Sequence, residues 1–149
     1  MKKDLLNELL QLNVWARSLK KLEQETIYQP IAENKWSIAE IISHLMFWDR
    51  YILQERIPIM VPNASLKSDV NVNEMNNKAS EYTRSEVSFN EIIDSLIDCR
   101  ESIVSILEEK SEEELSSTFK INDKELNLIS YFKGTLKHDA HHMQQINHF

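Results

Sequence analysis

Glycine and proline are scarce in this chain, whose 149 residues include one glycine and three prolines. Both residues mark turns, and a protein built from many short strands needs such marks often. Few stretches alternate polar and apolar residues as half-buried strands do. These absences disfavour a β-rich fold and predict an all-α protein made of long helices.

Cysteine is almost absent as well. Cys99 is the single cysteine, so no intramolecular disulfide can form, and the chain suits a reducing compartment. Its place on the apolar side of a helical pattern predicts a buried small hydrophobe. The chain also has no apolar run of about 18 residues, and the acids and asparagine among its first leucines lead us to expect no signal peptide. We therefore expect a cytoplasmic protein that does not cross a membrane.

Positive charge is sparse and scattered. The net charge is -7, and the basic residues gather only in a short group at Arg17, Lys20 and Lys21. A protein that tracks nucleic-acid phosphates needs a broader basic surface, so nucleic acid is not expected as a partner. The length fits one domain with its own core, so residues 1–149 are expected to form a single domain.

What the sequence does contain is helical periodicity. Leucines recur every three to four positions over residues 3–23, which predicts the first long helix. The second is expected from Ser37, which forms a capping box with Glu40, to Pro58. The third is expected from the cap residue Ser88 to just before Ser111. A second capping box begins at Ser111 and predicts one short turn of helix.

The last long helix is expected from Asn127 almost to the C-terminus. Residues 24–36 are expected to be a connection, residues 58–70 to lack regular structure, and residues 71–84 to form a shorter, polar helix. Four long helices in one domain predict a four-helix bundle, with either up-and-down or crossover connections.

Histidine is concentrated at the end of the chain, where four of the five histidines fall within the last twelve residues. His138 and His142 are four positions apart, so on a helix both can reach one ion. His141 competes for this role, but about 100° of rotation per residue places it opposite the apolar stripe. The pattern therefore favours the pair His138 and His142.

A third histidine strengthens this interpretation. His44 lies at the margin of the apolar stripe of the second helix, from which it can point across the bundle. Neutral imidazoles suit a divalent ion such as zinc, nickel, copper or iron, and three protein ligands leave a coordination position open. The alternative is that these are incidental core and surface histidines.

Three further residues are candidates for catalysis. Asp139 falls near the centre of the apolar face of the last helix, where a carboxylate needs a partner. That partner could be a metal-bound histidine, which the carboxylate would orient, or a lysine or arginine from another helix. Glu40 and Tyr51 share the side of the second helix that carries His44, and either could serve as acid, base or substrate contact, or simply be a polar edge residue.

The same residues carry a family resemblance. The two stretches concerned are Trp36-Ser37-x-x-Glu40-x-x-x-His44 and His138-Asp139-x-His141-His142-x-x-Gln145-Ile146. Together they resemble the DinB/YfiT-like superfamily, and the similarity spans nearly the whole chain. It implies a four-helix bundle, often a homodimer, whose metal is held by one histidine on the second helix and two on the last. By motif position these are His44, His138 and His142.

The resemblance leaves the reaction open, because a fold does not fix its chemistry. Some relatives resemble thiol S-transferases that use bacillithiol or mycothiol, so a metal-dependent transferase with a low-molecular-weight thiol as co-substrate is the first hypothesis. A hydrolase that uses a metal-activated water is the second, with Glu40 or Asp139 moving protons. A non-catalytic protein that binds a metal or ligand in a stress response is the third.

Overall fold

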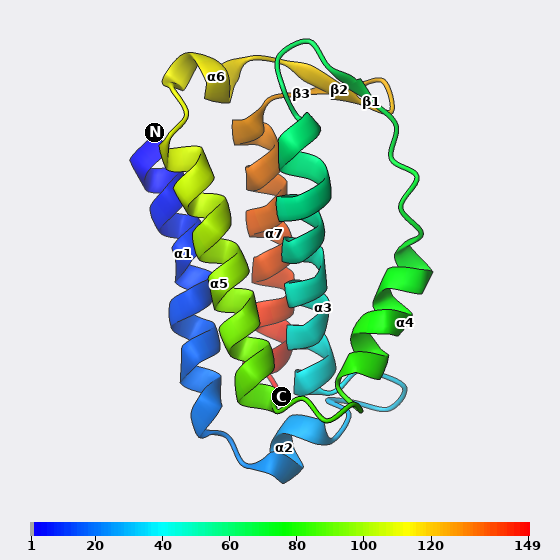
Figure 1. Cartoon of the computed structure of the whole chain (residues 1–149). Coiled ribbons are helices and arrows are strands. Elements are labelled where there is room, and N and C mark those ends of the chain that lie inside the picture. The colour runs from blue at the N-terminus through cyan, green and yellow to red at the C-terminus, as the bar shows by residue number, and fades with distance from the viewer. Residues whose placement is uncertain (1) are drawn as a thin grey trace.

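Four long helices form the body of the molecule in the computed structural model, which describes residues 2–149 (Figure 1). They are α1 (Lys2–Ser18), α3 (Ile38–Tyr51), α5 (Phe89–Glu108) and α7 (Leu128–Asn147). Three short helices flank them, α2 (Gln24–Tyr28), α4 (Val72–Tyr82) and α6 (Glu112–Ser116). The predicted four-helix bundle is confirmed.

The connections are of the crossover kind. Figure 1 shows α3 and α5 running in the same direction, while α1 and α7 run the opposite way. The segment that contains α4 returns the chain along the outside of α3, and α4 packs against that helix. Of the two topologies that the sequence allowed, the structure therefore has the one with a long crossover, which brings α4 beside α3.

The helix starts follow the capping signals. Ser37 and Glu40 exchange hydrogen bonds in a capping box at the start of α3, and Ser111 and Glu114 do so at the start of α6. Ser88 caps α5 through its side chain. Each cap satisfies backbone N–H groups that the first helical turn leaves free, so these starts are fixed locally.

The helix ends depart further from prediction. The first helix ends at Ser18 and continues as a 3-10 turn, η1 (Leu19–Lys21). The second ends at Tyr51 and continues as a π-helical turn, η2 (Ile52–Arg56), and a 3-10 turn, η3 (Ile57–Ile59). Residues 24–36, predicted as a connection, include α2. The α-helix was predicted to reach Pro58 but stops at Tyr51, and Pro58 lies within η3. The wider π turn between them was not predicted.

A small sheet covers one end of the bundle and was missed. Strand β1 (Ser65–Leu66) pairs in parallel with β2 (Phe119–Ile121), which pairs antiparallel with β3 (Lys124–Leu126). The hairpin turns at Asn122 and Asp123, whose φ angles of 50° and 69° suit the tight turn between such strands. Strands of two or three residues are too short for alternation to reveal, so the prediction that residues 58–70 lack regular structure was wrong at β1.

The core has two apolar clusters with a charged layer between them. One cluster gathers around Ile41, Ile42 and Leu96, and the other around Leu9 and Phe132. The charged layer consists of three buried residues, Arg100, Asp49 and Asp139. Each lies, along its own helix, between residues of one cluster and residues of the other. Cys99 was predicted to be buried, but it is only partly buried. Its neighbour Arg100 is the residue of this part of α5 that faces the core.

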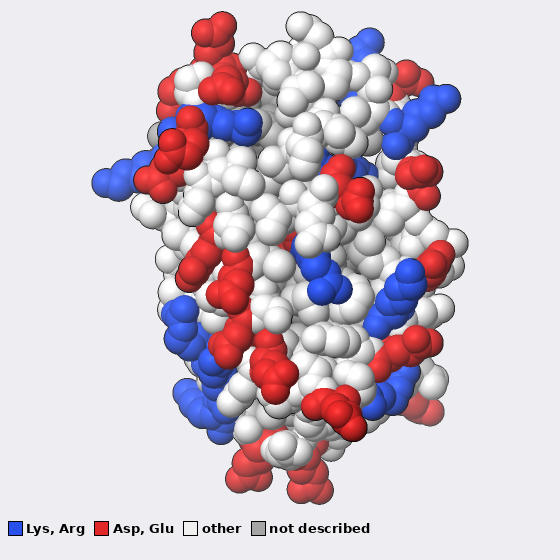
Figure 2. All heavy atoms as spheres, in the orientation of Figure 1, with Lys and Arg blue, Asp and Glu red and all other residues white. Residues whose placement is uncertain are grey.

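No helix within residues 2–149 has both the length and the apolar character needed to span a bilayer. On the face shown in Figure 2, lysine and arginine side chains lie among aspartate and glutamate side chains rather than in one continuous basic area.

Candidate metal centre

Three histidines meet between α3 and α7. His44 on α3 and His142 on α7 are buried, and His138, one turn before His142, is partly buried. The Nε2 atom of His138 lies 3.0 Å from Nε2 of His44 and 3.1 Å from Nε2 of His142. The potential ligand atoms of the three all lie within 4.8 Å of one another. The two distant parts of the sequence therefore converge at one point, as the spacing predicted.

The outer nitrogens of two rings are held by side-chain amides. Nδ1 of His44 lies 2.9 Å from Oδ1 of Asn76, on α4, and Nδ1 of His142 lies 2.8 Å from Oε1 of Gln145. An amide oxygen only accepts hydrogen bonds, so each Nδ1 must carry the proton and donate it. In the neutral rings, Nε2 of His44 and of His142 is then a bare lone pair that faces His138.

This donor set fits a divalent cation. A proton on Nε2 of His138 can serve only one of the two lone pairs that face it, whereas a cation can accept all three nitrogens. At metal–nitrogen distances of about 2.0 to 2.1 Å, a tetrahedral ion separates its nitrogen ligands by about 3.3 Å, close to the observed spacing. Neutral imidazoles suit zinc, nickel or iron.

Burial keeps the three rings neutral. It lowers the pKa of His44 to about 3, with the nearby His142 contributing, and lowers the pKa of His142 to about 4. Burial is also the main cause of the lowered pKa of His138, and His141 adds to it. Since a metal competes with protons for these nitrogens, lowered pKa values favour metal binding at and below neutral pH.

The lowered pKa values predict how the metal-free protein responds to acid. Unfolded histidine has a pKa near 6.5, so between about pH 4 and 6.5 the unfolded chain binds more protons than the folded one, and stability is lost as the pH falls. Allowing for partial solvation of the rings, we expect the free energy of unfolding to drop by about 2 kcal/mol from pH 7 to pH 5. Urea unfolding in the presence of a chelator at both pH values measures this. His44→Gln should reduce the dependence of the free energy of unfolding on pH.

Asp139 is bound to an arginine rather than to the histidines. Both of its carboxylate oxygens accept hydrogen bonds from Arg100, at 2.8 and 3.1 Å. Of the two partners that the sequence allowed, the structure has the basic residue from another helix. Asp49 takes the other side of the same guanidinium, at 2.7 and 2.9 Å. The catalytic role of Asp139 stays a prediction, and its visible role is structural.

Glu40 and Tyr51 are also engaged elsewhere. Glu40 accepts a hydrogen bond from the backbone of Ser37 in the capping box and another from the Ser80 hydroxyl on α4. The hydroxyl of Tyr51 accepts a hydrogen bond of 2.8 Å from Nε of Arg56 in η2. Of these contacts, the one between Ser80 and Glu40 holds α4 against α3. A catalytic role for either residue stays a prediction.

Some residues of the site were not predicted from the sequence. Asn76 lies on α4, and only the crossover brings it to His44. Gln145 belongs to the same motif as His142 and lies three positions after it on one helix, a spacing that could have indicated the contact. The rings of Trp36 and Trp48 flank His44, with centroids 5.0 and 6.3 Å away.

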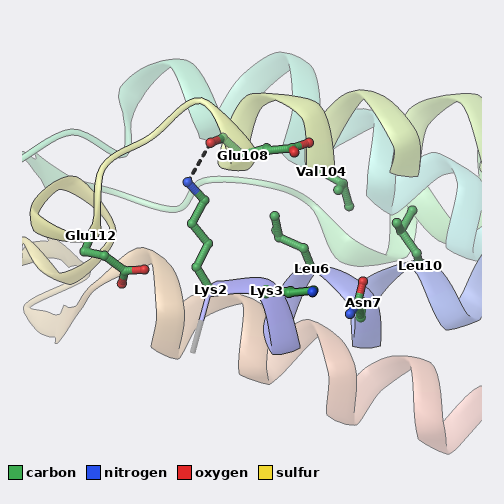
Figure 3. Close-up of a pocket in the computed structure, with 8 residues that line it drawn as sticks. All are labelled: Lys2, Lys3, Leu6, Asn7, Leu10, Val104, Glu108 and Glu112. Atoms are coloured by element: carbon green, nitrogen blue, oxygen red, sulfur yellow. Dashed lines mark hydrogen bonds between the residues drawn. The ribbon is translucent and has the colours of Figure 1, made fainter.

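One cavity reaches the histidines from the side of His138. It has a volume of about 380 Å³ and is lined by residues of α3, η2 and α7. A larger cavity of about 830 Å³ lies between α1, α5 and α6 (Figure 3). Its lining includes Lys2, Leu6 and Glu108 but none of the histidines, and Lys2 donates to the Glu108 carbonyl at its edge. The smaller cavity therefore borders the candidate centre through His138. A third cavity, of about 260 Å³, borders it on another side through His142 and Gln145.

Comparison with known proteins agrees with this description. The sequence model of the DinB superfamily matches residues 10–146. Among solved structures, the fold is similar to that of YfiT from Bacillus subtilis, described as a probable metal-dependent hydrolase with an unusual four-helix bundle topology. The TM-score is 0.80 at 11% sequence identity, over 99% of this chain and 84% of YfiT. No curated protein sequence matches the chain significantly.

Proposed function

Because the chain belongs to the DinB superfamily and its three histidines converge on one point, we propose that it is a metal-dependent hydrolase with His44, His138 and His142 as metal ligands. The observation that carries the proposal is the orientation of the rings. Hydrogen bonds from Nδ1 to Asn76 and Gln145 leave the Nε2 lone pairs of His44 and His142 facing inward, toward His138.

Three neutral histidine ligands suit a hydrolase, because they leave the full charge on the metal ion. A divalent ion that keeps its full charge lowers the pKa of a bound water toward neutrality and so supplies a nucleophile. The chain's own contribution is to fix the three rings, to keep them unprotonated and to offer a cavity beside His138 for the substrate. The description of YfiT as a probable hydrolase supports this choice over thiol transfer, the first hypothesis from the sequence.

Turnover without thiol tests the proposal. Protein loaded with zinc, nickel or iron(II) is incubated with a panel of 4-nitrophenyl esters and anilides in the absence of any thiol. We expect release of the chromophore, loss of release after chelation and recovery when the ion is restored. Turnover that depends on an added low-molecular-weight thiol would instead support the transferase, and ion binding without turnover of either kind would support the non-catalytic binder.

The hydrogen bond to His44 gives a second expectation. Asn76→Ala removes the acceptor for Nδ1–H, so His44 loses both its orientation and its fixed tautomer, and we expect metal affinity to fall by about 10-fold to 100-fold. Competition with a coloured chelator measures the affinity. The matched control is Asn77→Ala, because Asn77 is the exposed neighbour of Asn76 on α4 and should leave affinity unchanged. Equal affinities for the two variants would contradict the assigned role.

A further inference from the structure

Gly134 lies on α7 one helical turn before His138, at the rim of the cavity beside the candidate centre. We propose that this glycine keeps the cavity open and that the cavity binds an uncharged, apolar group of the substrate. The inference rests on the proposed function, because it assumes that the ion at the three histidines acts on a substrate that enters from this side.

The cavity has a buried floor and an open rim. Its floor is formed by Leu45, Asp49 and Ile52, which are 1%, 3% and 7% exposed. Trp48 and Tyr131 are partly buried walls, and Gly134 is exposed. Its volume of about 380 Å³ equals that of roughly a dozen water molecules at about 30 Å³ each. This lies at the small end of the range for ligand sites.

Neither backbone conformation nor packing explains the glycine. Gly134 is the chain's single glycine and lies inside a 20-residue helix, where alanine would be more stable. Its φ angle is not positive, so its backbone needs no glycine. A Cβ atom built on it would meet no other atom within 4 Å, so no neighbour excludes a side chain. Because Gly134 lines the cavity, a larger side chain at this position is expected to occupy part of its space.

The lining selects an uncharged group. Leu45, Trp48 and Ile52 present apolar surface. The carboxylate of Asp49 is the one acidic group of the lining, and both of its oxygens accept hydrogen bonds from the buried Arg100. Both oxygens of Asp49 are therefore engaged within the core by Arg100, which Asp49 shares with Asp139, rather than free to bind a ligand. The side chains of Tyr131 and Thr135 offer hydroxyl groups for one or two hydrogen bonds.

Because Gly134 is the single glycine of the chain, its amide can be followed by NMR as a probe of the cavity. Labelling with ¹⁵N-glycine gives one amide resonance, that of Gly134, without further assignment. Two hydroxamates are titrated into zinc-loaded protein, acetohydroxamate and hexanohydroxamate, which share the metal-binding group and differ by four methylenes. Hexan-1-ol is titrated into metal-free protein, where it can occupy the cavity without an ion. Ser102→Gly, on the exposed side of α5, adds a control resonance remote from the cavity.

We expect hexan-1-ol and hexanohydroxamate to shift the Gly134 resonance and leave that of the glycine at position 102 unchanged. Burial of part of the alkyl tail should make hexanohydroxamate bind about tenfold tighter than acetohydroxamate. Gly134→Leu should reduce this ratio to near unity and leave acetohydroxamate affinity unchanged. Gly134→Ala, which favours the helix and so should fold, should reduce the ratio about twofold and raise the melting temperature.

The outcomes separate this inference from the proposed function. If no substrate is hydrolysed but hexan-1-ol shifts the Gly134 resonance, the cavity stands and the hydrolase proposal fails. If substrates are hydrolysed but both Gly134 variants keep the tenfold preference for the longer hydroxamate, the hydrolase stands and the cavity assignment is overturned. An unshifted Gly134 resonance with hexan-1-ol also overturns it, whether or not the protein binds zinc.

Discussion

Replacing Arg100 with methionine is expected to lower the free energy of unfolding by about 3 to 5 kcal/mol, because it leaves two buried carboxylates without their cation. Arg100 is 1% exposed and connects all four long helices. From α5 it donates to Asp49 on α3, to Asp139 on α7 and to the Leu9 carbonyl on α1. Urea unfolding monitored by tryptophan fluorescence measures the change.

A surface arginine provides the control. Arg84 is an exposed side chain that lies 3.9 Å from the partly buried Glu40, and ion pairs at the protein surface contribute about 1 kcal/mol or less. Arg84→Met should therefore change stability little. Adding Asp49→Asn and Asp139→Asn to Arg100→Met should recover part of the loss, because neutral amides cost less to bury without a partner than carboxylates do. A loss for Arg100→Met no larger than that for Arg84→Met would show that the buried network does not hold the helices together.

Removing one metal ligand is expected to abolish stoichiometric metal binding, and with it the stability that the ion adds. An ion present at a hundred times its dissociation constant raises the free energy of unfolding by about 2.7 kcal/mol when only the folded chain binds it. His142→Ala should lose this increment, because the remaining two rings no longer enclose the ion. Elemental analysis of the purified protein and unfolding with and without added zinc measure both effects.

The neighbouring histidine is a stringent control. His141 lies next to His142 on the same helix but is exposed. His141→Ala should therefore keep both the bound ion and its stabilising effect. Loss of the ion in His141→Ala and its retention in His142→Ala would reverse the assignment of ligands and remove the basis for the proposed chemistry.

Local sequence patterns were enough for most of the helices and for the choice of histidines. The capping residues Ser37, Ser88 and Ser111 marked helix starts correctly, because a cap and its helix are only a few residues apart. The spacing of His138 and His142 was informative for the same reason. Short strands such as β2 were missed, because two or three residues are too few to show alternation and β2 pairs with the distant β1. The π-helical turn η2 was missed as well.

The partners of the site residues were harder to predict. The sequence left open whether Asp139 faces a histidine or a basic residue, and the structure decided for Arg100, which reaches Asp139 on α7 from α5. Nothing near Asn76 in the sequence indicates a contact with His44, which exists because the crossover lays α4 along α3. Such contacts join residues that are dozens of positions apart, and periodicity within one helix carries no information about them.

By itself, the sequence determined the helices, their apolar faces and the three histidines that can share an ion, since these follow from capping and from the 3.6-residue period of the helix. Only the tertiary structure decided the direction of α5, the buried charge network, the amides that orient the rings and the cavity at Gly134. These depend on how completed helices pack, and packing is set by side chains that meet across the bundle rather than along the chain.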